Sequence, residues 1–158
     1  SWNGTIDEKL GDAQKAFACY LFTVPGVPLL YNGQEADLDK RLEFFKRDPI
    51  EWKETELTPF YTKLVHLRTS HPALRHGIEG GSYDVLKTSN QSVVAYKRVK
   101  GDGEVLTILN MSNKPVTVAL KDGATAGSYK DIFTDAGVEI AQGSKMQMEP
   151  WGYMVLVK

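Results

Sequence analysis

The sequence predicts an α+β fold in which a helix–strand–loop–helix segment precedes an all-β antiparallel sandwich. Two observations lead to this prediction. Residues 1–76 combine helical apolar spacing with one short apolar run, whereas residues 77–158 consist of short strand-like runs separated by turn residues. This change of hydrophobic period predicts a domain boundary, with one domain at residues 1–76 and a second at residues 77–158.

Composition excludes several classes of protein. The 158 residues contain 19 Lys and Arg against 20 Asp and Glu, so no basic field exists to attract nucleic acid. No apolar run approaches the ~20 residues needed to cross a membrane, so we expect neither nucleic acid nor membrane as a partner. Cys19 is the single cysteine, which excludes an internal disulfide, and its apolar helical context favours a buried inert thiol. The cellular location is left open, since a targeting signal upstream of Ser1 would not be visible.

The first helix is expected to begin near Asp12, a good N-cap residue. Pro25 and Gly26 should end it, because proline disfavours helix in the residue before it and glycine permits a sharp reversal. Between Asp12 and Pro25, apolar side chains recur at helical spacing and predict one buried stripe along the helix. These residues are Ala13, Ala16, Phe17, Tyr20 and Leu21.

Residues 27–31 predict a short strand. They are apolar at consecutive positions, a pattern typical of a strand buried on both faces in a parallel sheet, and Pro28 favours the edge or the start of a strand. A long polar stretch follows, from residue 34 to residue 55, and loops of this length are often functional. A second helix is then expected from Thr58, with Pro59 at its first position, until His71 and Pro72 end it. Its predicted apolar face consists of Phe60, Leu64, Leu67 and His71, with Tyr61 and Val65 beside it.

The second half predicts eight short strands separated by turn residues. Their spacing indicates an antiparallel sandwich in which each sheet keeps one wet face. The expected strands are residues 82–87, 92–99, 104–111, 115–120, 128–133, 138–140, 145–148 and 153–157.

Four stretches together resemble the C-terminal part of α-amylase-family glycoside hydrolases. Residues 25–35 (PGVPLLYNGQE) resemble the last barrel strand and the turn after it, and residues 64–77 look like the last barrel helix. Residues 105–112 and 149–153 are similar to the central and closing strands of the family's C-terminal sandwich. One departure is Asp37, since the family pattern has a glycine soon after the position of Glu35.

The resemblance implies that the chain is the remnant of a (β/α)₈ barrel followed by its β-sandwich, because such a barrel needs about 250 residues. The family's catalytic aspartates and glutamate would then lie upstream of Ser1, so we expect no catalytic residue in this chain and no cleavage by the chain alone. The whole enzyme would act on α-glucans by a retaining mechanism. Calcium, where the family binds it, generally belongs to the missing part, so no cofactor is expected here.

The expected partners follow from the same resemblance. They are the missing barrel portion and an α-glucan substrate. Without neighbouring barrel strands, residues 27–31 would leave an unpaired apolar edge. We therefore expect the isolated chain either to self-associate or to rearrange its first half.

Five residues after the predicted strand are candidate cleft-lining residues: Gln34, Glu35, Arg41, Phe44 and Phe45. Glu35 is either a cleft carboxylate or a loop organiser that accepts backbone or arginine hydrogen bonds, and we favour the second. The aromatic rings, with Trp52, either stack on sugar faces or anchor the loop.

The histidines and the aromatic residues of the second half are weaker candidates for a functional site. His66, His71 and His76 recur every five residues, which rotates each away from the last and argues against a metal site, since helical metal pairs are spaced i, i+4. Aromatic residues of the sandwich would serve a carbohydrate-binding module, the first alternative function, but ordinary packing is the interpretation we favour: Tyr83, Tyr129, Trp151 and Tyr153. A purely structural domain is the second alternative.

Overall fold

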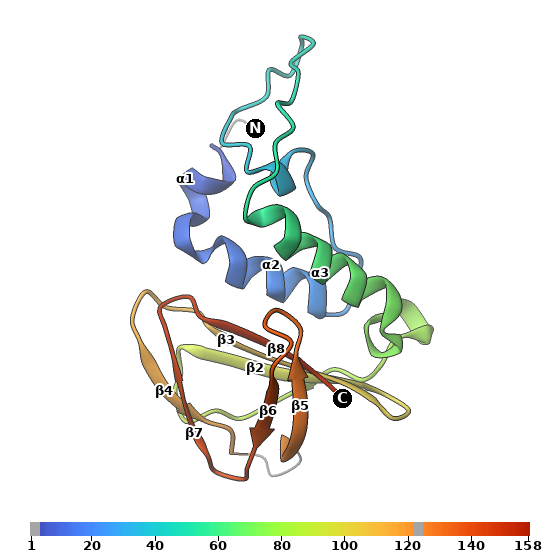
Figure 1. Ribbon diagram of the computed structural model, residues 1–158, viewed down its shortest axis with the longest axis vertical. Coiled ribbons are helices and arrows are strands. Elements are labelled where there is room, and N and C mark those ends of the chain that lie inside the picture. Colours follow the sequence, from blue (N-terminus) through green and yellow to red (C-terminus); the bar gives the residue numbers. More distant parts are fainter. Residues whose placement is uncertain (1–3, 122–124) are drawn as a thin grey trace.

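The computed structural model describes residues 4–121 and 125–158 and stacks three layers (Figure 1). Helices cover one face of a six-stranded sheet, and a two-stranded sheet covers the other. The helices are α1 (Ile6–Leu10), α2 (Gln14–Thr23) and α3 (Leu57–Ser70). Single 3₁₀ turns are η1 (Gly11–Ala13), η2 (Gln34–Ala36), η3 (Pro72–Leu74) and η4 (Gly77–Glu79). The strands are β1 (Asp84–Val85), β2 (Val93–Lys100), β3 (Gly103–Asn110), β4 (Val116–Ala119), β5 (Gly127–Asp131), β6 (Gly137–Ile140), β7 (Lys145–Met148) and β8 (Tyr153–Val157).

The chain enters its first helix earlier than predicted. A capping box starts α1: the backbone N–H of Glu8 donates to Thr5 Oγ1 at 3.1 Å, and the backbone N–H of Thr5 donates to Glu8 Oε2 at 2.9 Å. The Thr-x-x-Glu spacing was the signal in the sequence that could have revealed this helix. Gly11, at φ +45°, is the C-cap residue of α1 and the first residue of η1, and it separates α1 from α2.

The buried face of α2 differs from the predicted stripe. Leu21 is exposed, whereas Ala18, Cys19 and Phe22 are buried. The helix turns this face to the sheet because Tyr20, Phe22 and Cys19 contact residues that come much later in the chain, which local periodicity does not reveal. The inert role expected for Cys19 fits its surroundings, since burial raises the pKa of its thiol well above the usual value.

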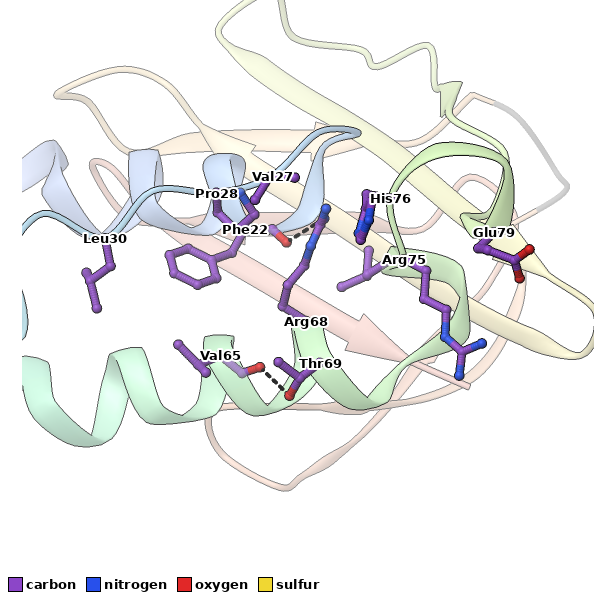
Figure 2. Close-up of a pocket in the computed structure, with 11 residues that line it drawn as sticks. Phe22, Val27, Pro28, Leu30, Val65, Arg68, Thr69, Arg75, His76 and Glu79 are labelled. Carbon is purple, nitrogen blue, oxygen red and sulfur yellow. Dashed lines mark hydrogen bonds between the residues drawn. The ribbon is translucent and has the colours of Figure 1, made fainter.

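Residues 27–31 form no strand here, so that prediction is wrong for this chain. They run as an extended segment between α2 and η2, and the side chains of Val27 and Leu29 are each 78% exposed. Val27, Pro28 and Leu30 line a cavity against α3 (Figure 2), and Leu29 is not among its lining residues. A strand exists only through a hydrogen-bonded neighbour, and no described residue pairs with this segment.

Helix α3 lies close to its prediction. It begins at Leu57 rather than Thr58, with Glu56 as N-cap residue, and His71 ends it as expected. Pro59 therefore sits in the first turn, where its missing N–H is not needed. The predicted face is buried except for His71, which is half-buried, and Leu57 and Tyr61 join it.

The second half confirms the antiparallel all-β prediction. The large sheet has the strand order β1-β2-β3-β8-β5-β6, and β4 pairs with β7 in the small one. Every pair is antiparallel, with registers such as Tyr96↔Thr107 and Val118↔Met146. The bounds of β7 and β8 agree with the predicted ranges 145–148 and 153–157. The first strand is shorter than predicted, because only Asp84 and Val85 pair with β2.

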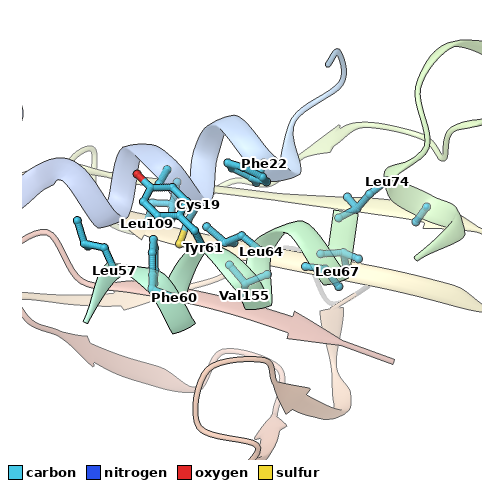
Figure 3. Close-up of a cluster of buried hydrophobic side chains, with 13 residues drawn as sticks. Cys19, Phe22, Leu57, Phe60, Tyr61, Leu64, Leu67, Leu74, Leu109 and Val155 are labelled. Carbon is cyan, nitrogen blue, oxygen red and sulfur yellow. The ribbon is translucent and has the colours of Figure 1, made fainter. Parts of the chain in front are cut away.

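The expectation of one wet face on each sheet is wrong for the large sheet. Along β3, Val105 and Leu109 contact the helices, whereas Leu106 and Ile108 contact the small sheet, and all four are fully buried. The helical half of the chain covers the face that a free-standing sandwich would expose to water. The helix-side cluster therefore joins the two halves (Figure 3), and burying apolar surface of this kind is the main stabilising contribution to folding.

Candidate functional site: the loop after residues 27–31

The turn after residue 31 depends on two left-handed residues. Gly33 has φ +88° and Asp37 has φ +56°, on either side of η2. Asp37 occupies the position where the family resemblance leads one to expect a glycine, and its backbone conformation is one that glycine adopts without cost. The loop conformation is therefore kept although the residue type differs.

Gln34 is held by two hydrogen bonds. Its Oε1 accepts from the backbone N–H of Tyr31 at 3.2 Å, and its Nε2 donates to Tyr61 Oη at 2.5 Å. Burial raises the pKa of Tyr61 to about 12, while the hydrogen bond from Gln34 acts in the opposite direction. The side chain of Gln34 thus links the turn to α3 and has a fixed orientation.

Glu35 fits neither of its two sequence-based interpretations in full. Its backbone carbonyl accepts from Thr58 Oγ1 at 3.0 Å, so the main chain of Glu35 does help to fix the loop. Its carboxylate, however, accepts no hydrogen bond at Oε2, which is buried and has no partner among the described residues. The side chain is therefore not the loop organiser that we favoured.

Neighbouring residues Gln34 and Glu35 face different cavities. Gln34 lines a groove of about 420 Å³ between α1 and the loop, together with Tyr31, Asn32 and Lys40. Glu35 lines a cavity of about 380 Å³ against α3. The structure thus separates two candidate residues that the sequence grouped together.

Arg41 lies beside the groove. Its Nη2 donates to Glu8 Oε2 at 2.9 Å, and this hydrogen bond, together with the one from the Thr5 backbone, lowers the pKa of the Glu8 carboxyl. Both side chains are about half exposed, so the pair contributes little to stability. Its effect is to hold the loop against the start of α1.

The aromatic candidates lie farther out. The loop of residues 38–54 extends away from the sheets (Figure 1). Phe44 and Phe45 are 80% and 86% exposed and contact each other edge-to-face, with ring centroids 5.1 Å apart. Trp52 is also exposed. None of the three rings is tucked against the rest of the described chain, so the structure does not support their role as loop anchors.

A third cavity, of about 610 Å³, lies between residues 27–30 and α3 (Figure 2). Phe22, Leu30 and Val65 form its apolar wall, and Arg75, His76 and Glu79 lie at its rim. The sequence did not point to this cavity, because its walls come from four separate segments of the chain.

Two further properties, metal binding and membrane crossing, have no supporting feature among the described residues. Among them, no group of three or more His, Cys, Asp and Glu side chains could hold a metal ion. His66 is exposed, and His71 Nδ1 accepts from the backbone N–H of Ala73 at 3.3 Å. No helix in residues 4–121 and 125–158 has the length and apolarity to cross a membrane.

The aromatic side chains of the sandwich are mostly engaged in packing. Tyr129 is buried and donates to Glu104 at 2.6 Å. Tyr153 packs edge-to-face on Phe60 and Phe133, and Tyr83 tilts onto Tyr96. In the described part of the sandwich, these contacts engage Tyr83, Tyr129 and Tyr153 in packing, as the interpretation that we favoured expects.

Comparisons with known proteins agree with this architecture. Residues 83–155 match the family described as "Maltogenic Amylase, C-terminal domain". The chain is 31% identical over 142 residues to α-amylase MalA of Haloarcula japonica, covering 84% of this chain and 21% of that protein. It is 29% identical over 143 residues to neopullulanase 2 of Thermoactinomyces vulgaris, covering 87% of this chain and 24% of that protein.

The fold is similar as well. The crystal structure of a maltogenic α-amylase, AmyB from Thermotoga neapolitana, superposes with a TM-score of 0.78 at 24% identity, covering 92% of this chain and 36% of that one. The chain thus spans about a fifth of the length of the curated relatives it matches. By sequence and by fold, the chain belongs to the α-amylase family and corresponds to the C-terminal part of such enzymes.

Proposed function

We propose that this chain is the C-terminal part of a glycoside hydrolase that acts on α-glucans by a retaining mechanism. In that enzyme residues 1–76 complete a (β/α)₈ barrel and residues 77–158 form the β-sandwich packed against it. The observation that carries the proposal is the segment 27–31. It is extended, it has apolar side chains on both faces, and its neighbouring strands are absent from the described residues. Those are the properties of a parallel barrel strand that lacks its partners.

The chain alone should not cleave a glycosidic bond. Retaining hydrolysis needs two carboxyl groups about 5 Å apart. Barrel active sites lie at the carboxyl ends of the strands, which here is the groove beside Tyr31. Its described lining residues are Gly4, Thr5, Ile6, Lys9, Leu10, Tyr31, Asn32, Gln34, Leu38, Lys40 and Leu42, without an Asp or Glu among them. The catalytic carboxylates would therefore come from upstream of Ser1.

The substrate class is inferred from the relatives. They include a cyclomaltodextrinase 31% identical over 124 residues and the neopullulanase, and AmyP, a structural neighbour, was crystallised with maltotriose. The names of these proteins all refer to substrates or ligands built of α-linked glucose units. We therefore propose a starch-like glucan or a maltooligosaccharide as the substrate of the whole enzyme.

Within that enzyme the loop would form one wall of the cleft. Gln34 faces the groove with a fixed amide, and Arg41 stands beside it. Phe44 and Phe45 present largely exposed rings, which suit the apolar faces of glucose units. Glu35 points to the opposite side and is not proposed to touch the substrate.

No cofactor is proposed for this chain. A calcium ion in the whole enzyme would need ligands from elsewhere, since calcium takes six to eight oxygen ligands and the described residues hold no suitable group of side chains.

The test compares the chain with the complete gene product that contains it. Release of reducing ends from soluble starch should be seen with the complete enzyme and should be absent with residues 1–158. Turnover by residues 1–158 alone would contradict the proposal. A titration of residues 1–158 with maltoheptaose separates the alternatives, because saturable heat without turnover would favour the carbohydrate-binding module.

We also propose that the isolated chain self-associates through residues 27–31. Val27 and Leu29 expose apolar side chains, and the backbone groups of residues 27–30 make no hydrogen bond to the described residues. Unpaired edges of this kind are templates for pairing with a second chain.

A further inference from the structure

We propose that the Glu35 carboxylate is a recognition point for a cationic side chain, a guanidinium or an ammonium group, on the segment of protein that pairs with residues 27–31. This inference rests on the proposed function, in which that segment belongs to the rest of the barrel. It assigns to Glu35 a role that neither sugar binding nor loop organisation explains.

The first observation is the unpaired oxygen itself. Glu35 Oε2 is buried and has no hydrogen-bond partner among the described residues. A buried carboxylate oxygen is costly unless a donor or a positive charge compensates it. Buried polar groups without a partner are few in native proteins, so this oxygen calls for a donor from beyond the described residues.

The second observation is that the threonine hydroxyl groups lining the Glu35 cavity are already engaged, and that Tyr61 Oη, which also lines it, accepts from Gln34 Nε2 at 2.5 Å. Thr58 donates its hydroxyl proton to the backbone carbonyl of Glu35 at 3.0 Å, and Thr62 donates to the carbonyl of Thr58 at 2.8 Å. Thr69 bonds the carbonyls of Val65 and His66 on its own helix. The wall of the cavity therefore offers few donors to the Glu35 carboxylate, which stays available as an acceptor for a side chain from another segment.

The third observation concerns position. The Glu35 cavity, of about 380 Å³, shares Leu30 and Val65 with the larger cavity beneath residues 27–30. A strand that pairs with residues 27–31 would thus run along the same side of α3 and carry its side chains to the mouth of this cavity. The space is large enough for a long basic side chain, whose aliphatic stem would lie against Leu30 and Val65.

A cation fits this cavity better than a neutral donor does. A carboxylate has two acceptor oxygens and a full negative charge, and hydrogen bonds between two ionised groups are the stronger class. Among the described residues that line the cavity, His66 is the one able to become cationic, and no hydrogen bond joins it to Glu35. The positive charge would therefore come from the pairing segment.

One experiment uses residues 1–158 by themselves and does not depend on the proposed function. Glu35→Gln removes a carboxylate whose buried Oε2 has no hydrogen-bond donor, so the melting temperature should rise by about 2–4 °C. Glu54→Gln, at an exposed position, is the matched control and should leave the melting temperature unchanged. A lower melting temperature for Glu35→Gln would overturn the inference, because the carboxylate would then be compensated within the chain.

A second experiment measures the partner. The polypeptide that precedes Ser1 in the complete gene product is titrated with wild-type residues 1–158, with Glu35→Gln and with Leu29→Asp. Glu35→Gln should weaken association at least about tenfold, because one partner of a buried charge pair is lost. Wild-type affinity for Glu35→Gln, with weak binding of Leu29→Asp, would overturn the role of Glu35 and leave the proposed function standing. Absence of binding by the wild-type chain, or equal affinity of all three, would instead overturn the proposed strand pairing.

Discussion

The hydroxyl oxygens of Thr23 and Tyr96 lie 2.6 Å apart and join the last residue of α2 to strand β2, across 73 positions of sequence. Thr23 Oγ1 also lies 2.6 Å from the carbonyl oxygen of Cys19, which can only accept. Because threonine has one hydroxyl proton and gives it to that carbonyl, Tyr96 must be the donor to Thr23. Both side chains are fully buried, so this bond couples the helical half to the sandwich.

Tyr96→Phe removes the donor and leaves Thr23 Oγ1 with an unused lone pair in the core. We expect the free energy of unfolding to fall by about 1–2 kcal/mol, the usual cost of a lost buried hydrogen bond. Urea unfolding measures this value, with Tyr31→Phe at an exposed position as the control. A Thr23→Val, Tyr96→Phe double-mutant cycle should give a coupling energy clearly different from zero, and additive losses would contradict the bond.

Arg98 reinforces the same junction. Its guanidinium donates to the carbonyl groups of Ser82 at 2.7 Å, Gly81 at 3.2 Å and Thr23 at 3.3 Å, and the residue is 2% exposed. A cation at the C-terminus of α2 also interacts favourably with the helix dipole. Arg98→Met should leave the buried carbonyl of Thr23 and the part-buried carbonyls of Gly81 and Ser82 short of a donor, and it should lower the unfolding free energy by about 3 kcal/mol.

Arg47→Met, at an exposed position, is the control for Arg98→Met. If the junction unites the two halves, residues 1–76 should lose hydrogen-exchange protection in the Arg98 variant before the sandwich does. Unchanged protection in both halves would show that Arg98 does not connect them.

Leu29→Lys tests the exposed segment. The side chain is 78% exposed, so the unfolding free energy should change by no more than about 0.5 kcal/mol. A charge on an unpaired edge opposes pairing with a second copy, so light scattering should show less self-association than in the wild type. Phe45→Lys removes a similar apolar surface at the loop tip and should leave the association unchanged. A wild-type chain that is monomeric at all concentrations would contradict the proposed self-association.

His71 should make stability depend on pH. Burial lowers the pKa of its imidazole in the folded state, whereas the unfolded group titrates near its ordinary value of about 6.5. Between the two values the unfolded chain binds more protons, so the unfolding free energy falls as pH is lowered through this window and is fully retained above it.

His71→Asn keeps an acceptor near the backbone N–H of Ala73 and removes the titrating group. Unfolding free energies measured from pH 7 to pH 5 should therefore depend less on pH in this variant than in the wild type. His76→Asn, at an exposed position, should keep the wild-type slope. Equal slopes for His71→Asn and the wild type would assign the pH dependence to other groups.

Phe44→Ala and Phe45→Ala probe the loop tip. Both rings are largely exposed, so each variant should unfold within about 0.5 kcal/mol of the wild type. In the complete enzyme at least one of them should weaken maltoheptaose binding, since stacking on a ring is lost. Ile78→Ala, at another exposed apolar position, is the control, and unchanged binding in both loop variants would remove these rings from the proposed cleft.

Local features of the sequence foretold much of this fold. Alternation at residues 145–148 and the short apolar run at residues 153–157, with a turn signal before each, were enough to predict β7 and β8. Pro72 likewise fixed the end of α3. Cleft candidates were harder to assign, since Gln34 and Glu35 are adjacent in sequence yet face different cavities.

By itself the sequence determined the order of α2, α3 and the eight strands of the second half, their antiparallel character and the resemblance to the α-amylase family, because these depend on periodicity, turn residues and short motifs. Only the tertiary structure decided which face of α2 is buried, that residues 27–31 remain unpaired, that Arg98 is buried and that Glu35 Oε2 lacks a partner. Those properties depend on contacts between segments tens of residues apart. A local sequence pattern cannot predict which distant side chain will contact a given residue.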